Sequence, residues 1–382
     1  MLNTTLVLFA YFWFAAIVMV STTRNFLWLL LPYLAFIIEE MLFYATNMEL
    51  MFSGADRTAT FYDIALLGQK LGSDVTDDNY SEGYYVNLEG KEDYSVSSRQ
   101  AENQKFAKIL ELIGAERGDT ILNMGCGTCT FEAFCHTRGI HMIGITISSE
   151  QKKLCEKKGE EAVIWNYHHF NEDLVNTADH IICMGTTEHI QTGAANSMRA
   201  YEKKVEVSAK IFKTFQRYFK KDGKQHNLFF SGLHQNKACI HDWALMPLQR
   251  CYGGLYFLDT DGLDARAMAR KSGYTVTHWA DHTKDYFMPS KLDPNHFGNP
   301  SPFFSKSSIM LFLVGLLYPY AMYTWVYTVT GCWMYMFDRK LHFHRPGEND
   351  FTLETPGKVP CPLYWGVFSH RAVASQSAEA IR

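Results

Sequence analysis

Short apolar segments alternate with helical patterns through the middle of this chain, and this alternation limits its fold more than any other feature. Each apolar segment spans four to seven residues and is bounded by turn residues, which is typical of buried strands. Strands that alternate with helices predict an α/β fold with helices on both faces of a mostly parallel sheet. The expected strands are Thr120–Met124, His141–Ile147, Ala162–Trp165, His180–Met184 and Asn227–Ser231, and the clearest helices are Arg99–Ile113 and Met198–Phe219.

The N-terminal stretch from Leu2 to Thr23 is apolar and carries no charged side chain. About 20 apolar residues suffice to cross a bilayer. A cleaved signal peptide is the rival interpretation, but no basic region precedes the stretch, and aromatic residues fill the position of a small-residue cleavage site. We therefore expect a retained N-terminal transmembrane anchor.

A second apolar stretch, Phe26–Ile38, follows Arg24 and ends at the carboxylates Glu39 and Glu40. Carboxylates in the middle of a bilayer are costly. The stretch is therefore either a second span with a short apolar core or a helix that lies in the interface. The sequence favours the first alternative slightly.

Charge and cysteine content argue against two classes of protein. The 36 basic side chains are balanced by 40 acidic ones, and no basic run is longer than a pair such as Lys220–Lys221, so we expect no nucleic-acid partner. The nine cysteines are odd in number and irregularly spaced. This pattern is typical of reduced, buried thiols in a cytosolic domain rather than of a secreted disulfide framework.

A glycine-rich turn directly follows the first expected strand. In the segment ILNMGCGTCTF, residues 121–131, Gly125 and Gly127 allow a ligand to approach the backbone, and the next helix begins with unpaired N–H groups. Cys126 and Cys129 form a CxxC pattern, but no second cysteine pair and no nearby histidine completes a metal site. By itself this turn is either an ordinary tight turn or a nucleotide-type site, and we expect no metal there.

Polar side chains end the second expected strand. Thr146, Ser148 and Gln151 lie where the ribose of a nucleotide sits in a doubly wound sheet. They belong to the segment GITISSEQ, residues 144–151. This segment is very similar to GVTISxEQ of the cyclopropane-fatty-acyl-phospholipid synthases and the related mycolic acid cyclopropane synthases. The chain therefore resembles a family of S-adenosylmethionine-dependent methyltransferases.

Further segments resemble the same family, in the family's order, from about Phe61 to Arg345. Each match alone is modest, and the order makes the set specific. The matching segments are YSEGYY at residues 80–85, the helix and glycine loop at 101–131, NYHHF at 166–170, TEHIQ at 187–191, LHQN at 233–236, DY at 285–286 and GCWMYMFDRKLHFHR at 331–345. The resemblance implies a Rossmann-like methyltransferase sheet, with Leu341–Arg345 as its closing strand.

The resemblance also implies S-adenosylmethionine as cofactor and a bicarbonate ion beside the transferred methyl group. In the family, the double bond of an acyl chain attacks the sulfonium methyl group, and bicarbonate then removes a proton from the cation. Glu188, His234 and Tyr286 match the residues that hold bicarbonate. The positions that would bind S-adenosylmethionine are Tyr80, Ser81, Gly125, Cys126, Gly127, Thr146, Gln151, Asn166 and Tyr167.

Three positions depart from the family pattern. The acidic residue at the end of the first strand is Asn123 here, the third glycine of the loop is Cys129, and the cysteine of the first motif is Glu82. A second carboxylate beside Glu188 would repel a bound anion. Three possibilities stay open for Glu82: it points away from the site, it accepts the proton itself, or the chemistry uses another nucleophile. We favour the second and count Glu82 among the catalytic residues.

The uncharged run Ser307–Phe337 is long for one membrane span, and a sheet strand that follows it cannot lie across the membrane. With Pro319 as a break, we expect a monotopic or re-entrant element near the acyl-chain entrance and a catalytic domain on the cytosolic side. The expected regions are a membrane anchor at 1–50, the methyltransferase domain at 51–305, a hydrophobic helix with the closing strand at 306–346, and a polar, poorly ordered tail at 347–382.

The sequence therefore predicts a membrane-associated methyltransferase that converts an unsaturated lipid acyl chain to a cyclopropane or methyl-branched product. One alternative is methylation of another amphipathic acceptor, such as a sterol or an amine-bearing headgroup. The other is a catalytically silent membrane-bound adaptor that keeps only the fold. The expected partners are the membrane and its lipids, while the lipid class, the organelle, the number of spans and the oligomeric state stay open.

Overall fold

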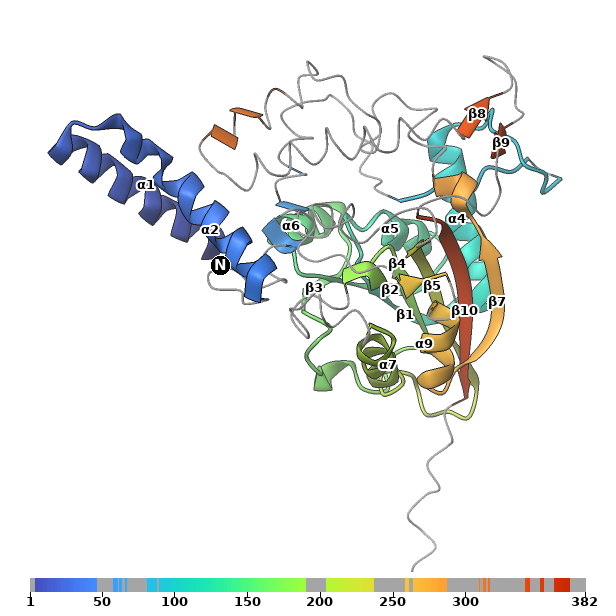
Figure 1. The fold of residues 1–382 in the computed structure, drawn as a ribbon. Helices are drawn as coiled ribbons and strands as arrows, with labels where there is room; N and C mark the ends of the chain where they lie inside the picture. The colour runs from blue at the N-terminus through green and yellow to red at the C-terminus, as the bar shows by residue number, and fades with distance from the viewer. Residues whose placement is uncertain are drawn as a thin grey trace, which may run out of the picture.

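The structure is a computed structural model, and its described residues include an N-terminal pair of helices and a central sheet (Figure 1). The described residues are 4–46, 58–60, 62–63, 66, 81–87, 89–189, 204–236, 258–260, 264–286, 309, 312–313, 315–316, 341–343, 351–353 and 361–371. Statements about the fold refer to these residues.

The central sheet has the strand order β3-β2-β1-β4-β5-β10-β7, and the short strand β6 pairs with the end of β5. Strands β1 to β5 run parallel, and β10 is antiparallel to both of its neighbours. The strands are β1 Thr120–Met124, β2 His141–Thr146, β3 Ala162–Ile164, β4 His180–Met184, β5 Gln225–Gln235, β6 Leu258–Asp259, β7 Thr275–Asp281 and β10 Leu363–Arg371.

Five helices accompany these strands in the described residues: α4 Ser98–Ile113, α5 Thr130–His136, α6 Ser149–Lys158, α7 Lys204–Phe215 and α9 Ala265–Lys271. The short 3-10 turns η2, Glu172–Leu174, and η3, Thr187–His189, flank β4. Local sequence explains the bounds of α4. The Ser97 side chain accepts a hydrogen bond from the Gln100 amide at its start, and Gly114 ends it in the left-handed conformation.

Side chains alternate between the two faces of each strand, so the sheet has an apolar layer on either side. Helices α4 and α5 cover one face, where Phe106 and Phe131 share a buried cluster with Phe229 of β5. Helices α7 and α9 cover the other, where Phe212 shares a cluster with Phe230 of β5. The predicted α/β fold with helices on both faces is thereby confirmed.

The bounds of most predicted strands agree with the structure to within a residue. β1 and β4 have the predicted ends, whereas β5 extends from Gln225 to Gln235 instead of Asn227 to Ser231. Most of the extra residues are not apolar, and pairing extends the strand: β10 pairs with β5 from Gln225 to Leu233, and β6 pairs with His234 and Gln235. Helix α7, Lys204–Phe215, ends four residues before the helix predicted at Met198–Phe219, and residues 198–203 lie outside the described residues.

The strand that closes the sheet is β10, and the assignment of Leu341–Arg345 to this role was wrong. Strand β8, Leu341–Phe343, pairs with β9, Phe351–Leu353, in a separate two-stranded sheet. β10 lies in the region expected to be a polar tail, yet Trp365 and Phe368 are fully buried. The beginning of that region is polar, but the segment CPLYWGVF, residues 361–368, has the composition of a strand buried on both faces.

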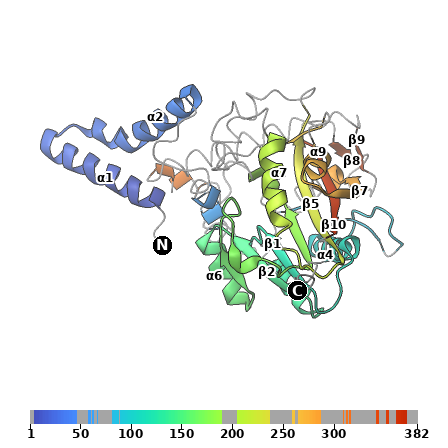
Figure 2. The ribbon, with the colours of Figure 1, turned by 90° about the horizontal axis from the view of Figure 1, so that it is seen from below.

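The N-terminal helices α1, Thr4–Thr23, and α2, Leu31–Thr46, are joined by the 3-10 turn η1, Phe26–Leu30. They lie side by side and extend away from the sheet (Figures 1 and 2). Among the described residues, no helix combines the length and the apolar character that a bilayer span requires. The transmembrane anchor stays a prediction.

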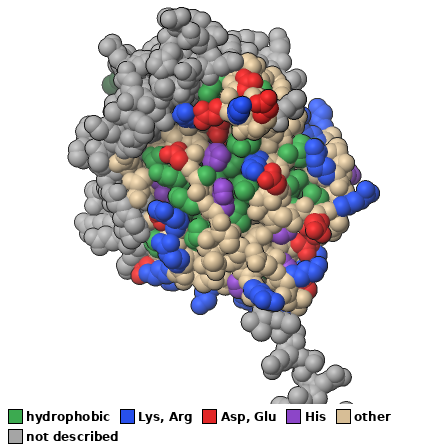
Figure 3. All heavy atoms as spheres, turned by 90° about the vertical axis from the view of Figure 1, so that its right-hand side faces the viewer, with side chains coloured by type: hydrophobic (Ala, Val, Ile, Leu, Met, Phe, Trp, Pro, Cys, Tyr) green, Lys and Arg blue, Asp and Glu red, His purple; other side chains and the backbone are tan. Residues whose placement is uncertain are grey.

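The surface of this helical pair differs from that of the sheet domain. Phe26 and Leu27 expose 74% and 69% of their surface. On the side of the molecule that carries the edge strand β7, basic and acidic side chains are instead interspersed with small hydrophobic areas (Figure 3). Exposed apolar area is thus concentrated on the N-terminal helices among the described residues.

Candidate active site

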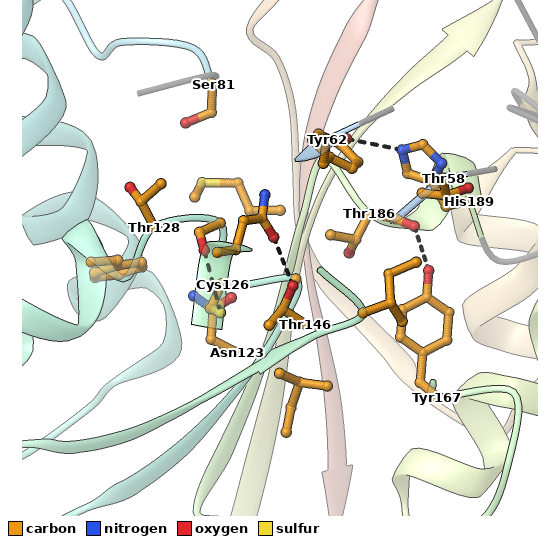
Figure 4. Close-up of a pocket in the computed structure, with 18 of the residues that line it drawn as sticks. Thr58, Tyr62, Ser81, Asn123, Cys126, Thr128, Thr146, Tyr167, Thr186 and His189 are labelled. Atoms are coloured by element: carbon orange, nitrogen blue, oxygen red, sulfur yellow. Dashed lines mark hydrogen bonds between the residues drawn. The ribbon is translucent and has the colours of Figure 1, made fainter. Parts of the chain in front are cut away.

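A pocket lies at the carboxyl ends of the parallel strands, where loops leave β1, β2, β3 and β4 (Figure 4). This is the edge at which doubly wound sheets bind their ligands. The pocket contains eight of the nine residues that the sequence analysis assigned to the cofactor. They are Ser81, Gly125, Cys126, Gly127, Thr146, Gln151, Asn166 and Tyr167. The ninth, Tyr80, lies outside the described residues.

The two glycines of the loop after β1 differ in what surrounds them. Gly125 has φ of +109°, and a Cβ atom there would lie 1.9 Å from Cγ2 of Thr186. Gly127 has φ of +57°, and a Cβ atom there would meet nothing within 4 Å. Gly125 therefore lets the loop pack against the end of β4, whereas Gly127 leaves open space on the pocket side.

The end of β2 presents a preorganised polar pair. The Thr146 hydroxyl donates to Oε1 of Gln151 at 2.7 Å, and both side chains are buried. Ser148 caps α6 by accepting a hydrogen bond from the Gln151 amide at 3.1 Å. This cap sets the first turn of α6, and it therefore holds the backbone N–H group of Gln151 at the pocket wall.

Tyr167 and His168 form the wall that follows β3. The Tyr167 hydroxyl donates to the carbonyl of Thr186 at 3.0 Å, which ties this loop to the end of β4. Burial lowers the pKa of His168 to about 4, so its ring is neutral at neutral pH. His168 was not predicted as a site residue, although it lies in the NYHHF segment.

Several other lining residues were not predicted: Tyr62 lies outside the recognised motifs, whereas His189 lies in the TEHIQ segment but received no role there. Tyr62 and His189 are the most notable, since the Tyr62 hydroxyl and Nε2 of His189 lie 3.1 Å apart (Figure 4). Burial, and then the nearby Glu188, raise the pKa of Tyr62. The other lining residues that were not predicted include Thr58, Glu102, Phe106, Thr128, Trp165 and Thr186.

Two buried polar atoms at this pocket have no hydrogen-bond partner within the described residues. They are Oδ1 of Asn123 and Nε2 of His168. A buried polar atom without a partner costs about 1–3 kcal/mol, so each is a natural contact for a polar ligand. Together with the open side of Gly127 and the Thr146–Gln151 pair, they fit the amino-acid and nucleoside groups of S-adenosylmethionine.

A buried carboxylate next to this pocket is held by two donors from distant strands. Glu82 follows the lining residue Ser81 and is 2% exposed. Its Oε1 accepts hydrogen bonds from the Ser231 hydroxyl of β5 at 2.6 Å and from the Trp365 indole of β10 at 2.8 Å. His282 stacks on Trp365 with the ring centroids 3.8 Å apart. Glu82 therefore points into the protein and not into solvent.

The structure brings Glu188 and Tyr286 into the electrostatic environment of Glu82. Burial raises the pKa of Glu188 to about 7, opposed by a hydrogen bond from the Leu233 amide and assisted by the charge of Glu82. Burial, and then Glu188, raise the pKa of Tyr286, and Glu82 contributes further. Three of the four predicted catalytic residues thus lie in one buried region.

The fourth, His234, lies on the opposite face of β5. Side chains alternate along a strand, so Ser231 and His234, three positions apart, point to opposite faces. The ring of His234 packs edge-on against Trp279 at 5.7 Å. Its Nδ1 lies 3.1 Å from the Gly232 carbonyl, and its Nε2 accepts from the Ala265 amide at 3.2 Å. In this position His234 bonds to backbone, and the structure does not bring it together with Glu82.

The cysteines near the glycine loop differ from the sequence expectation. Cys129 and Cys155 form a disulfide, whereas reduced thiols were expected throughout. The Sγ atoms of Cys126, Cys129 and Cys155 all lie within 4.8 Å of one another. The spacing of the CxxC pattern did not reveal Cys155, because α6 brings it to the loop from 26 residues away.

Comparisons with known proteins place this geometry among related chains. The profile of the family described as mycolic acid cyclopropane synthetase matches residues 61–288, more than half of the chain. A Mycobacterium tuberculosis protein named "Probable fatty acid methyltransferase Rv3720" is 33% identical over 100 residues, which are 25% of this chain. The matched stretch spans 23% of that relative's length.

Solved structures share the fold at low sequence identity. The cyclopropane synthase MmaA2 from Mycobacterium tuberculosis has a TM-score of 0.56 and 13% identity, covering 83% of this chain and 98% of its own. The mycolic acid cyclopropane synthase CmaA1, solved with SAH and CTAB, has a TM-score of 0.52 and 14% identity, covering the same shares of the two chains. At these identities the likeness concerns the fold.

Proposed function

Because this chain belongs to the mycolic acid cyclopropane synthetase family, we propose that it uses S-adenosylmethionine to methylate an unsaturated lipid acyl chain. The product would be a cyclopropane or a methyl-branched chain. The observation that carries the proposal is the single pocket lined by eight independently predicted cofactor positions. Two buried polar atoms at that pocket also have no hydrogen-bond partner within the described residues, which supports a polar ligand there.

Different residues at the pocket would contact different groups of S-adenosylmethionine. Gly125 and Gly127 would admit the methionyl end, Thr146 and Gln151 would bind the ribose, and Tyr167 and Asn166 would border the adenine. When bound, S-adenosylmethionine supplies a methyl group that is electrophilic because it sits on a sulfonium centre. The apolar part of the lining, which includes Phe106, Phe131 and Trp165, would limit the water that competes with a weak carbon nucleophile.

The proton that the substrate cation loses requires a base, and we assign that role to Glu82. When bound, S-adenosylmethionine would supply its methyl group to the alkene carbon, and the substrate cation would then have one proton to lose. The carboxylate of Glu82 then takes the proton as the ring closes, and later releases it to solvent. Ser231 and Trp365 support this role because both donate to Oε1 and so hold the carboxyl group of Glu82 in one position.

The neighbouring carboxyl group of Glu188 is suited to a different role. With a pKa of about 7, it is partly protonated at neutral pH and does not repel Glu82 fully. Partial protonation of Glu188 reduces the repulsion between two carboxyl groups in one buried region. This pairing supports Glu82 as the base without a bound bicarbonate ion.

We further propose that the protein works at a membrane, with its catalytic domain on the cytosolic side. The exposed apolar side chains of the N-terminal helices support this idea, since a large exposed apolar patch marks an interaction surface. A second apolar segment meets these helices: the Tyr33 hydroxyl of α2 donates to the Gly315 carbonyl at 2.8 Å. Near Gly315, Phe312 and Leu316 expose 38% and 45% of their surface.

Two measurements test the proposed function. Titration calorimetry on the full-length protein should detect S-adenosylmethionine binding, and Gly127→Val should abolish it because the side chain fills the pocket. Gly159→Val is the matched control: Gly159 also has positive φ and open space around its Cβ position, but it ends α6 and does not line the pocket. No binding to the wild type would favour a catalytically silent adaptor.

Mass spectrometry of lipids from cells that express the protein should then reveal the acceptor. A cyclopropane and an unsaturated methyl branch both add one CH2 unit to the acyl chain, so ozonolysis, which cleaves only the branched alkene, distinguishes them; a saturated methyl branch has two hydrogens more and would require a separate reductant. Expression of Gly127→Val should remove the new species. A methylated sterol or amine headgroup, with unchanged acyl chains, would refute the acyl-chain assignment and leave the methyltransferase assignment intact.

A further inference from the structure

Three sulfur atoms from separate parts of the chain meet behind the glycine loop. Cys126 and Cys129 belong to the loop after β1, and Cys155 belongs to α6. The Cys129–Cys155 disulfide therefore links the end of the loop to α6. Cys126 is the free third member, with its Sγ within 4.8 Å of the other two.

The strand next to the three sulfur atoms has a glycine where they approach it. Gly144 of β2 lies under the cluster, and a Cβ atom there would come within 2.9 Å of Sγ of Cys126 and 3.2 Å of Sγ of Cys129. Any larger residue at this position would push the sulfurs apart. The close approach of the cysteines thus depends on a glycine that the β-strand itself does not require.

The disulfide acts on the backbone that shapes the pocket. Cys129 is the N-cap residue of α5 and adopts φ of +58°, a left-handed conformation that is unfavourable for a residue with a Cβ atom. The preceding residues, Gly125 to Gly127, line the pocket. A covalent bond at Cys129 therefore holds the loop in a conformation that the chain would not favour on its own.

We propose that Cys126, Cys129 and Cys155 form a thiol–disulfide site whose oxidised state preorganises the loop for S-adenosylmethionine, an inference that rests on the proposed function. The disulfide strengthens cofactor binding because the loop is already ordered before the ligand arrives. Reduction releases the loop and lets Cys129 leave the left-handed conformation. The site thus couples the redox state of the surroundings to the affinity for the cofactor.

Cys126 gives this buried disulfide a route to the solvent. Cys129 and Cys155 are fully buried, whereas Cys126 is 7% exposed and lines the pocket. In oxidation, the Cys126 thiolate attacks a small disulfide such as oxidised glutathione, forming a mixed disulfide and releasing one thiol. The Cys129 thiolate then attacks Sγ of Cys126 and displaces the second small thiol.

A last exchange step completes the reaction. The Cys155 thiolate attacks Sγ of Cys129, forming the observed disulfide and returning Cys126 as a thiol. In total, one small disulfide is reduced to two thiols, which take up the protons of Cys129 and Cys155. Because Cys126 lines the pocket, bound cofactor should slow both this reaction and its reversal by a dithiol.

The test measures cofactor affinity in two redox states of the full-length protein. Affinity for S-adenosylmethionine is measured by calorimetry after treatment with oxidised glutathione and again after dithiothreitol, with a chelator present throughout. Peptide mass spectrometry after alkylation reports which thiols are free. We expect roughly tenfold weaker binding in the reduced state, the factor that a left-handed residue would account for.

Variants separate this effect from a general response to reductant. Cys155→Ser should show the weaker affinity in both states, and Cys126→Ser should form the Cys129–Cys155 disulfide much more slowly with oxidised glutathione. Cys135→Ala is the matched control, because Cys135 is a buried free cysteine in the same helix α5 and its loss should leave the redox response intact.

The possible outcomes distinguish this inference from the proposed function. If the disulfide opens and closes but the affinity does not change, the switch is refuted and the cofactor assignment stands. If oxidised glutathione produces no Cys129–Cys155 disulfide, the switch is refuted as well. If neither state binds S-adenosylmethionine, the proposed function fails, while thiol mapping still reports whether the disulfide exists.

Discussion

At the scale of single residues, the two carboxyl groups of Glu82 and Glu188 are the most unusual feature of the site. Both are almost completely buried, and carboxyl groups are rarely buried unless they are paired with donors. Glu82 has two side-chain donors on one oxygen, whereas Glu188 has the Leu233 amide. Burial raises the pKa of Glu188 to about 7, so a group able to exchange a proton near neutral pH lies in the same buried region as Glu82.

Replacement of Glu82 by Gln should stop turnover and leave cofactor binding unchanged. The amide oxygen of Gln can still accept from Ser231 and Trp365, so the fold should persist, but the side chain can no longer take a proton. A positioned general base contributes roughly 10²–10⁴-fold to a rate, and we expect a loss of that order. Product formation by lipid mass spectrometry measures it, with calorimetry as the binding control.

Bicarbonate provides the decisive comparison for Glu82. Glu82→Cys restores the residue of the family pattern and should recover activity only when bicarbonate is added. The wild type should be equally active in bicarbonate-free buffer. Loss of wild-type activity without bicarbonate, and its recovery on addition, would show that Glu82 is not the base.

A second prediction at this scale concerns Glu132 and the pH dependence of stability. It is fully buried in α5, accepts a hydrogen bond from Asn123 at 2.8 Å, and has its pKa raised by burial from 4.5 to about 7. The protonated form is favoured in the folded state, so its stabilising effect is complete below about pH 4.5 and is lost as the pH rises to about 7. This pKa shift corresponds to about 3 kcal/mol in the free energy of unfolding.

Glu132→Gln should therefore weaken the pH dependence of unfolding. Above pH 7 the variant should be more stable than the wild type by up to about 3 kcal/mol, and near pH 4 the two should be equal. Chemical unfolding followed at pH 4, 6 and 8 gives the comparison. Glu156→Gln, at an exposed position of α6, should keep the wild-type dependence. Equal slopes for all three proteins would contradict the assigned pKa.

At the scale of elements, β10 joins the last part of the chain to the sheet. It pairs with β5 over nine residues, Leu363–Arg371, and with β7 on its other side. It also supplies Trp365, which donates to Glu82. An element that the sequence analysis treated as a tail therefore supports both the core and the proposed base.

Truncation tests this role of β10. A chain that ends after residue 361 should fail to fold its sheet domain, because Trp365, Val367 and Phe368 lose their burial at about 1.5–3 kcal/mol each and β5 and β7 lose their shared partner. A chain that ends after residue 372 should melt like the full protein. Circular dichroism melting curves distinguish them. Equal melting of the two truncated chains would refute the role of β10.

A single substitution gives a milder form of the same test. Phe368→Ala should lower the free energy of unfolding by about 3–5 kcal/mol, because Phe368 is fully buried in β10. Ile164→Ala is a useful comparison, because Ile164 ends β3 with 47% of its surface exposed. This substitution should lower the free energy of unfolding much less. Chemical unfolding gives both values.

At the scale of the whole molecule, the order of elements limits how the chain can meet a membrane. β7 precedes the uncharged run Ser307–Phe337 and β10 follows it, yet both lie in one sheet. The chain between them therefore begins and ends on the same side of any membrane. A monotopic or re-entrant element stays a prediction that this limit allows, and the strand that imposes the limit is β10 instead of Leu341–Arg345.

Deletion of residues 1–50 should release the protein from membranes only in part. The N-terminal helices carry much of the exposed apolar surface, but Phe312, Leu313 and Leu316 stay exposed without them and still favour an interface. Flotation with lipid vesicles measures the bound fraction. Complete release, or none, would contradict the proposed division of membrane contact between the two segments.

An epitope tag placed after Arg371 gives the matching topological control. Because β10 pairs with β5, the tag should be as sensitive to added protease as the catalytic domain in sealed membrane vesicles. Protection of the tag while the domain is digested would refute the proposed arrangement.

The sequence by itself determined the features whose causes are local. Alternating apolar segments marked β1 to β4 nearly to the residue, serine caps and glycines bounded the helices, and the ordered motifs identified the family and eight lining residues. These features follow from contacts between residues close in the chain, because turn conformation, capping and side-chain periodicity are set within a few residues.

Only the tertiary structure decided which distant segments meet. It placed β10 between β5 and β7, turned His234 to the face opposite Glu82, brought Trp365 to Glu82, and joined Cys155 to Cys129. Each of these contacts depends on burial and strand pairing between residues far apart in the chain. A one-residue change of register reverses the face of every side chain in a strand, so no local pattern could have revealed them.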